Sequence, residues 1–340
     1  MPRSVPKLFP ASRGFEDRYG AANNSTIPDP DEVAARLNVQ PYTRSPRWVW
    51  KYAWRGHGKL LKILHWKDPA AAKDVDQSLK VVWLKALAAF NPKSPVYDPE
   101  RWTYDTLPRI SAWLIFRLIP ARFFPRLHHA NIELRTTYLD SMILKEIAAN
   151  TNKKIRLVSL GAGYDIRSVR WLSKGQVDEA WELDIPTVVE SKRVMLERLQ
   201  RRRQRRNQTT VLPTCRGVDL NNLAQVQELL QGILTDKHSS SSSSSNDQEW
   251  HTIFISEGVL IYLDPTIPGK LLKLCAATVT SGGTATASLC MADRLENSPG
   301  GEELAGREEL ARSSWELMDW CPKPGLARHM AVARLFHSNS

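Results

Sequence analysis

The sequence predicts an α/β protein with a doubly wound, largely parallel sheet of seven strands, a terminal antiparallel pair and an N-terminal helical cap. Ile155–Leu160 is a run of strand length, followed by the glycine turn Gly161–Gly163 and a helical pattern over Asp165–Ser173. Further strand-like runs then alternate with helical patterns, as parallel sheets require. Finally, Trp315–Cys321 and His329–Phe336 are predicted as two strands separated by a segment rich in proline and glycine. This ending favours a sheet closed by an antiparallel pair.

The remaining elements follow from periodicity in chain order. Apolar residues at helical spacing predict a helix over Asn131–Ala149. Pro186 suits the first turn of a later helix because a proline lacks only an N–H that would be unpaired there. The other predicted elements are a strand at 180–183, a helix at 186–203, a strand at 210–214, a helix at 222–233, a strand at 250–256, a helix at 266–281, a strand at 283–290 and a helical piece at 300–313.

Composition divides the 340 residues into three parts. Residues 1–46 are rich in proline, asparagine, serine and charge, so we expect a disordered lead. Residues 47–130 hold seven of the twelve tryptophans and short helical patterns, and are predicted to form a cap or lid in which the tryptophans pack. Residues 131–340 form the main domain, and its segment 237–249 is a serine-rich, low-complexity surface loop.

Positive charge is concentrated in one predicted helix. The formal net charge is +11, and much of the excess lies in Lys192–Arg206. Such a run is typical of a solvated helix end, and it is also compatible with nuclear localisation or contact with RNA. Aromatic residues do not interleave with the basic ones, which disfavours a groove for single-stranded nucleic acid.

The sequence contains no strong targeting or membrane signal. No stretch reaches the roughly 18 apolar residues of a membrane span, because Arg117 and Pro120 interrupt the nearest one. A cytoplasmic location is favoured, although the basic N-terminus is compatible with organelle targeting. The spacing of the cysteines predicts neither a disulfide framework nor a metal site; they are Cys215, Cys275, Cys290 and Cys321.

The glycine turn and the end of the next predicted strand suggest a nucleoside site. Gly161 and Gly163 would let the backbone approach a ligand closely. The turn lacks the third glycine of a dinucleotide fingerprint, so neither a pyrophosphate turn nor a dehydrogenase is favoured. Asp184 ends the second predicted strand, where an acid can accept hydrogen bonds from ribose hydroxyls. It is equally placed to cap the following helix.

Two further acids follow predicted strands. Asp219 could accept the amino group of an adenine whose ring Leu220 covers, or it could simply cap a helix. Glu257 ends the fourth predicted strand, where it would face a ligand at the sheet edge and could pair with an ammonium group. Polar residues at several successive strand ends together predict a binding site.

The sequence around these residues resembles the leucine carboxyl methyltransferase family, which includes enzymes that methylate protein C-terminal carboxylates, polyketides and tRNA. The resemblance runs from about Ser94 to Leu335 and is carried by ELRTTYLD, LGAGYDIR, ELDIPTVVESK, VDLNNL and ISEGVLIYL. It implies a class I methyltransferase fold of Rossmann-like type, with 131–340 as the domain that binds S-adenosyl-L-methionine. The residues that it implies for the cofactor are Arg135 at the carboxylate, Gly161, Asp184 at the ribose, Asp219 and Leu220 at the adenine, Glu257 near the amino group, and Lys85.

The resemblance implies a transferase that moves a methyl group to a carboxylate or hydroxyl oxygen of a protein or small molecule. A carboxylate acceptor is already ionised at neutral pH and needs no general base. His128, His129 and His251 are candidate bases for a hydroxyl acceptor, but no motif surrounds them, and no catalytic base is assigned. An RNA-modifying methyltransferase and an inactive binding module on the same fold remain the alternatives. The acceptor and the oligomeric state stay open.

Overall fold

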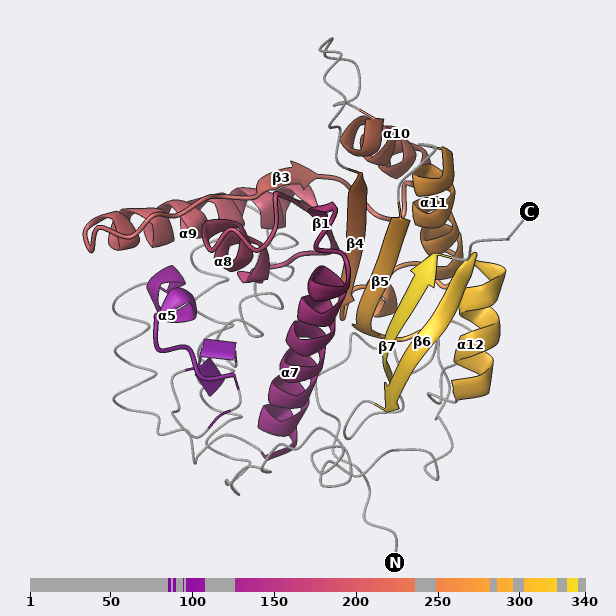
Figure 1. Cartoon of the computed structure of the whole chain (residues 1–340), viewed down its shortest axis with the longest axis horizontal. Coiled ribbons are helices and arrows are strands. Elements are labelled where there is room, and N and C mark those ends of the chain that lie inside the picture. The colour runs from indigo at the N-terminus through magenta and orange to yellow at the C-terminus, as the bar shows by residue number, and fades with distance from the viewer. Residues whose placement is uncertain are drawn as a thin grey trace, which may run out of the picture.

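The computed structural model describes residues 85–86, 88–89, 94, 96–107, 126–235, 249–281, 286–295, 303–322 and 329–335. Within these ranges, seven strands form one sheet in the order β3-β2-β1-β4-β5-β7-β6 (Figure 1). The strands are β1 (Lys154–Leu160), β2 (Glu179–Asp184), β3 (Thr214–Gly217), β4 (Trp250–Glu257), β5 (Thr286–Asp293), β6 (Trp315–Pro322) and β7 (His329–Leu335). Strands β1 to β5 pair in parallel, whereas β7 is antiparallel to both β5 and β6. The predicted doubly wound sheet with its terminal antiparallel pair is confirmed.

Helices cover both faces of the sheet. The described helices are α5 (Trp102–Thr106), α7 (Arg126–Ala149), α8 (Arg167–Ser173), α9 (Pro186–Gln204), α10 (Leu223–Thr235), α11 (Pro268–Ser281) and α12 (Glu303–Arg312), and a 3-10 turn, η4, spans Leu260–Tyr262. Successive residues of β1 point to opposite faces, as in any strand. Thus Val158 joins a core with α10, α11 and α12, whereas Leu157 joins a second core with α7 and α8. Both faces of β1 are therefore buried from Ile155 to Leu160, as expected for a central strand of a parallel sheet.

Two strands were predicted with the wrong bounds. The third strand begins at Thr214, not Thr210, because Pro213 has no N–H to donate and pairing with β2 starts at Thr214 opposite Trp181. The fifth strand extends to Asp293, not Cys290, because β7 pairs with it as far as Asp293 opposite His329. Both errors concern partners that are distant in sequence, which a local pattern cannot reveal.

The basic run of α9 is solvated on one side only: Arg193, Arg201, Arg205 and Arg206 are exposed, whereas the other basic residues contact the same chain. Lys192 is 1% exposed, and its Nζ lies 2.7 Å from Glu182 Oε2. In the last turns, Arg198 donates to the carbonyl of Thr106 at 2.8 Å. Arg202 donates to the carbonyl of Leu107 at 2.7 Å. The basic face of α9 therefore holds α5, which lies beside it in Figure 1.

Several sequence-based expectations fall outside the described residues. These are the lead at 1–46, the part of the tryptophan-rich cap at 47–84 and 108–125, and nearly all of the serine loop. Within the ranges that are described, no helix combines the length and apolarity that crossing a membrane would require.

Candidate functional site at the carboxyl edge of the sheet

The direction in which the chain adds strands to the sheet reverses between β1 and β4. The chain passes from β1 outward to β2 and β3, then returns to place β4 on the other side of β1. Ligands of open α/β sheets bind outside the carboxyl ends of the strands at such a switch point. The glycine turn follows β1 at this point, and Glu257 ends β4 beside it. Asp184 ends the neighbouring strand β2.

Asp184 is bonded to the glycine turn. Its Oδ2 accepts a hydrogen bond from the Gly163 amide at 2.6 Å, and its Oδ1 accepts one from the Ile185 amide at 2.8 Å. Burial raises the pKa of this carboxyl, although the two amides and Lys192 oppose the shift. Ile185 is the N-cap residue of α9 and makes no side-chain capping bond, so the alternative of Asp184 as that helix's cap was wrong. Each carboxylate oxygen keeps a lone pair for a further donor.

Gly161 brings β1 and the loop after β4 into close contact. It has a φ of +63°, and a Cβ at this position would lie 2.2 Å from Val259 Cγ2. Glycine is therefore required both by the left-handed backbone and by the neighbouring side chain. Asp293 in β5 orients the same loop, because its Oδ2 accepts hydrogen bonds from the amides of Val259 at 2.8 Å and Leu260 at 3.0 Å.

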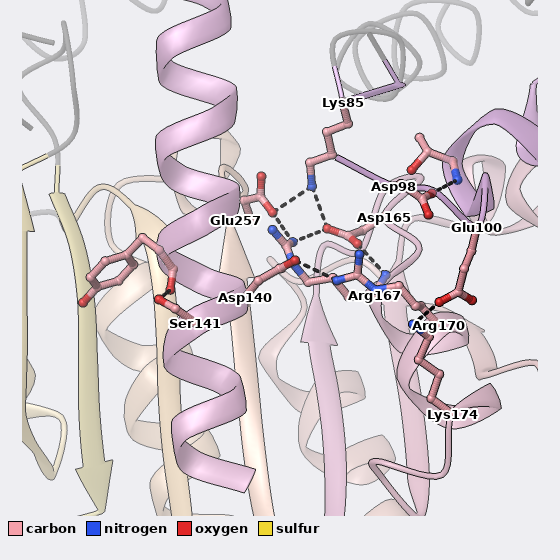
Figure 2. Close-up of polar contacts among 12 residues, drawn as sticks. Lys85, Asp98, Glu100, Asp140, Ser141, Asp165, Arg167, Arg170, Lys174 and Glu257 are labelled. Carbon is pink, nitrogen blue, oxygen red and sulfur yellow. Dashed lines mark hydrogen bonds and ion pairs between the residues drawn. The ribbon is translucent and has the colours of Figure 1, made fainter. Parts of the chain in front are cut away.

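Glu257 lies at the centre of a buried ionic cluster (Figure 2). Lys85 Nζ donates to Glu257 Oε2 at 2.9 Å and to Asp165 Oδ2 at 2.7 Å. Arg135, on α7, forms an ion pair in which its Nε lies 2.7 Å from Glu257 Oε1. Burial by itself would raise the pKa of Glu257, but Arg167, Lys85 and Arg135 outweigh it and hold that pKa well below its usual value. Glu257 is thus ionised at neutral pH.

Sequence reasoning missed the role of Arg167. Its Nη1 donates to both Asp165 Oδ2 and Glu257 Oε2, and its Nε donates to Asp140 Oδ1. Asp165 and Arg167 belong to the LGAGYDIR string, so their position at the turn was visible. Asp140 comes from the middle of α7, and no local pattern connects it with the turn.

Asp219 and Leu220 lie beyond β3. Asp219 is exposed, and its Oδ1 accepts hydrogen bonds from the amide and the side chain of Asn221 at 3.0 Å each. The Val218 amide donates to the Asp184 carbonyl at 2.8 Å, which ties this loop to the end of β2. Leu220 is only 3% exposed and packs in the core with α10 and α11.

The chain was compared with known families and structures. The model of a family described as leucine carboxyl methyltransferase matches residues 120–276. Residues 120–276 are therefore similar to the leucine carboxyl methyltransferase family. The match confirms the resemblance and, with the strand order, places the chain among S-adenosylmethionine-dependent methyltransferases. A search of curated proteins returned no match.

Solved structures of other methyltransferases are similar in outline only. Magnesium protoporphyrin IX methyltransferase from Synechocystis PCC 6803, with bound SAM, is 12% identical over 75% of this chain and 97% of that chain, with a TM-score of 0.39. The 1,6-didemethyltoxoflavin-N1-methyltransferase from Burkholderia thailandensis is 13% identical over 61% of this chain and 87% of that chain, with a TM-score of 0.34. Likenesses this low indicate no substrate for the methyltransferase described here.

The cluster has the charges that the amino-acid end of a methyltransferase cofactor requires. Glu257 and Asp165 offer anions to an ammonium group, whereas Arg135 and Lys85 offer cations to a carboxylate. The Nε of Arg135 faces Glu257 and lies 2.7 Å from its Oε1. A guanidinium presented in this way is well shaped for a carboxylate. The residues present therefore fit S-adenosylmethionine.

The described histidines of the methyltransferase do not form a basic centre at this edge. His251 begins β4 at the opposite edge, where its Nε2 lies 3.0 Å from Ser288 Oγ. Burial lowers its pKa to about 4. His329 lies at the carboxyl edge, but it is fully buried and stacked on Trp320 with ring centroids 4.0 Å apart. The side chains of His128 and His129 lie outside the described structure.

Proposed function

We propose that this methyltransferase uses S-adenosylmethionine to methylate a carboxylate or hydroxyl oxygen of a protein C-terminus or a small molecule. The observation that carries the proposal is the arrangement at the carboxyl edge of the sheet. One acid, Asp184, is bonded to the glycine turn, and a cluster of both charge signs surrounds Glu257 at the end of β4, on the other side of β1. A nucleoside with an amino-acid tail needs both features. The cofactor domain would span 131–340, with 47–130 as its cap.

Each residue would bind a different part of the cofactor. Asp184 would accept hydrogen bonds from the ribose hydroxyls, because both of its oxygens retain lone pairs. Arg135 and Lys85 would bind the carboxylate, and Glu257 the ammonium group. At the other end, Asp219 would accept the adenine amino group, with Leu220 supporting the ring from the core. The amides and carbonyls of Gly161 and Gly163 would line the turn.

A carboxylate acceptor agrees best with the surroundings. The bound cofactor supplies an electrophilic methyl group on a sulfonium, whose displacement leaves a neutral thioether. A carboxylate is already a nucleophile at neutral pH, so the protein must only orient it and exclude water. The described carboxyl edge offers ion-paired acids and cations, and its histidine His329 is fully buried. A hydroxyl acceptor would need a base from elsewhere in the chain.

The contacts of α9 disfavour RNA as the acceptor. Three of its basic residues form hydrogen bonds or ring contacts with residues 100–107 of the same chain; they are Arg198, Arg202 and Arg203. Guanidinium groups engaged in this way are less available to phosphates. The buried charge cluster around Glu257 likewise disfavours an inactive module, because buried charges are costly to keep where no ligand uses them.

Calorimetry with purified protein tests the proposal. We expect micromolar binding of S-adenosylmethionine or S-adenosylhomocysteine and no binding of NAD. Asp184→Ala should weaken this binding about tenfold to a hundredfold, because a hydrogen bond to a charged group contributes roughly 1.5–3 kcal/mol. Asp264→Asn, an exposed change in the loop after β4, serves as the control and should bind as the parent does. Unchanged affinity in a folded Asp184→Ala protein would exclude the ribose assignment.

A further inference from the structure

Arg167 makes more ionic contacts than any other cation described in the carboxyl-edge cluster. Its side chain is 5% exposed, and it contacts Asp140, Asp165 and Glu257. Among the residues that the structure describes, Arg135 is ion-paired with Glu257 alone. Lys85 contacts two carboxylates, and Arg167 binds both of them as well. The three cations around Glu257 are therefore not equivalent.

This inequality separates a fixed partner of Glu257 from exchangeable ones. If Arg135 or Lys85 turned toward a ligand, Glu257 would keep its bond to Arg167. If Arg167 were absent and the other two engaged a ligand carboxylate, Glu257 would be a buried carboxylate with no cation of its own. Such a group is strongly disfavoured and tends to take up a proton. Arg167 can thus preserve the negative charge of Glu257 while its neighbours exchange partners.

Asp140 secures Arg167 from the opposite side. It lies on α7, the helix that carries Arg135, and it accepts a hydrogen bond from Arg167 Nε (Figure 2). Its other oxygen accepts a bond from Arg170 Nη2 at 2.7 Å. Asp140 therefore joins α7 to the start of α8 on the side of the ionic cluster. The remaining nitrogen of Arg167, Nη2, is buried without a hydrogen-bond partner in the described structure.

We propose that Arg167, anchored by Asp140, is a positioning residue that keeps Glu257 ready to accept the cofactor's ammonium group while Arg135 and Lys85 move to its carboxylate. This inference rests on the proposed function, and it deepens that function by assigning different roles to three neighbouring cations. It has a specific consequence. Arg167 should matter for a ligand that has the amino-acid tail and should matter little for a nucleoside without it.

Two sulfur nucleosides distinguish these cases. S-adenosylhomocysteine contains the tail, whereas 5′-methylthioadenosine has the same thionucleoside without it. We would measure both affinities calorimetrically for the parent, Arg167→Gln and Arg167→Lys. Arg167→Gln should bind S-adenosylhomocysteine roughly ten- to a hundredfold more weakly, since a charged hydrogen bond is lost, and methylthioadenosine within about twofold of the parent. Arg167→Lys should recover part of the loss, because a lysine can still pair with Glu257.

Arg170→Gln is the matched control. Arg170 lies on the same helix and also donates to Asp140, but its side chain is 24% exposed and its recorded carboxylate contact is Asp140 rather than Glu257. Its substitution should leave both affinities within about twofold, because Arg170 makes no contact with Glu257 or Asp165 in the described structure. If Arg167→Gln does not fold, Asp140→Asn removes the anchor and should show the same selective loss to a smaller extent.

Each outcome decides the inference. A selective loss of S-adenosylhomocysteine binding supports it. An equal loss of both ligands, or no loss of either, overturns it and assigns Arg167 a purely structural role or none. If the parent protein fails to bind S-adenosylhomocysteine, the proposed function is overturned, and this inference with it. A loss seen only in the Arg167 variants leaves the proposed function intact.

Discussion

The guanidinium of Arg203 lies over the ring of Trp102, with its carbon 3.3 Å from the ring centroid. Trp102 is 1% exposed and Arg203 is 4% exposed, so the pair is enclosed where α5 meets the end of α9. The segment before α5 is tied in turn to the stretch that carries Lys85, because the Asp98 amide donates to the Ala89 carbonyl at 2.8 Å. The basic helix thus supports the segment that follows Lys85, the lysine of the ionic cluster.

Arg203→Ala should destabilise the protein. The substitution removes a desolvated cation–π contact of about 2 kcal/mol and opens space beside Trp102. Urea unfolding followed by tryptophan fluorescence would measure the change in free energy of unfolding. Arg205→Ala, an exposed neighbour, is the control and should change stability by less than about 0.5 kcal/mol. Equal effects of the two variants would show that the stacked pair contributes nothing particular.

Gly161→Ala should be more harmful than Gly175→Ala. Both glycines have a positive φ, +63° and +65°, so both substitutions introduce backbone strain of about 1–3 kcal/mol. Only at Gly161 would the new Cβ also meet Val259, at 2.2 Å from Cγ2, whereas no atom lies within 4 Å at Gly175. Thermal unfolding should therefore give the lower Tm for Gly161→Ala. Adding Val259→Gly should recover part of the difference; a double variant no better than Gly161→Ala would argue against the contact.

Glu133→Gln should stabilise the protein at pH 8. Burial raises the pKa of Glu133 from 4.5 to about 7, although a hydrogen bond from Ser94 opposes the shift. The unfolded chain loses this proton first, so stability contributed by the protonated form is lost as pH rises from about 4.5 to 7. A glutamine stays neutral and can still accept the Ser94 bond. The gain should be about 2–3 kcal/mol at pH 8 and vanish near pH 4 in denaturant titrations. A gain that is equal at both pH values would contradict this account.

Acid should weaken the fold through His251. Burial lowers its pKa from 6.5 to about 4, since desolvation and the charges of Lys153 and Arg334 outweigh the attraction of Glu146. The unfolded chain therefore binds the proton first, and stability falls as pH drops from about 6.5 to 4. Substitution His251→Gln should make this decline shallower by about 2–3 kcal/mol over that window. The stability of the His251→Gln variant at pH 7 is the reference for its decline in acid. If its stability falls with pH as steeply as that of the parent, the assignment to His251 is refuted.

Most of the fold followed from local patterns. The period of β1 and the glycine turn after it are contained within about twenty residues, and the structure has both at the expected place. β3 was placed four residues too early because its position depends on pairing with Trp181 and on the missing N–H of Pro213. The basic run of α9 was interpreted from charge alone, which does not show that Trp102 and the carbonyls of α5 accept those arginines.

By itself, the sequence determined the α/β class, the closing antiparallel pair and the family resemblance, because each is expressed in residues close together along the chain. It also placed acids at the strand ends, where parallel strands bring them to one edge. Only the tertiary structure decided which charges meet. Arg167 and Asp140 are 27 positions apart, and Lys85 reaches Glu257 across 172. Such pairings depend on how α7, α8 and the residues around Lys85 pack against the sheet, and that packing follows from the whole buried core.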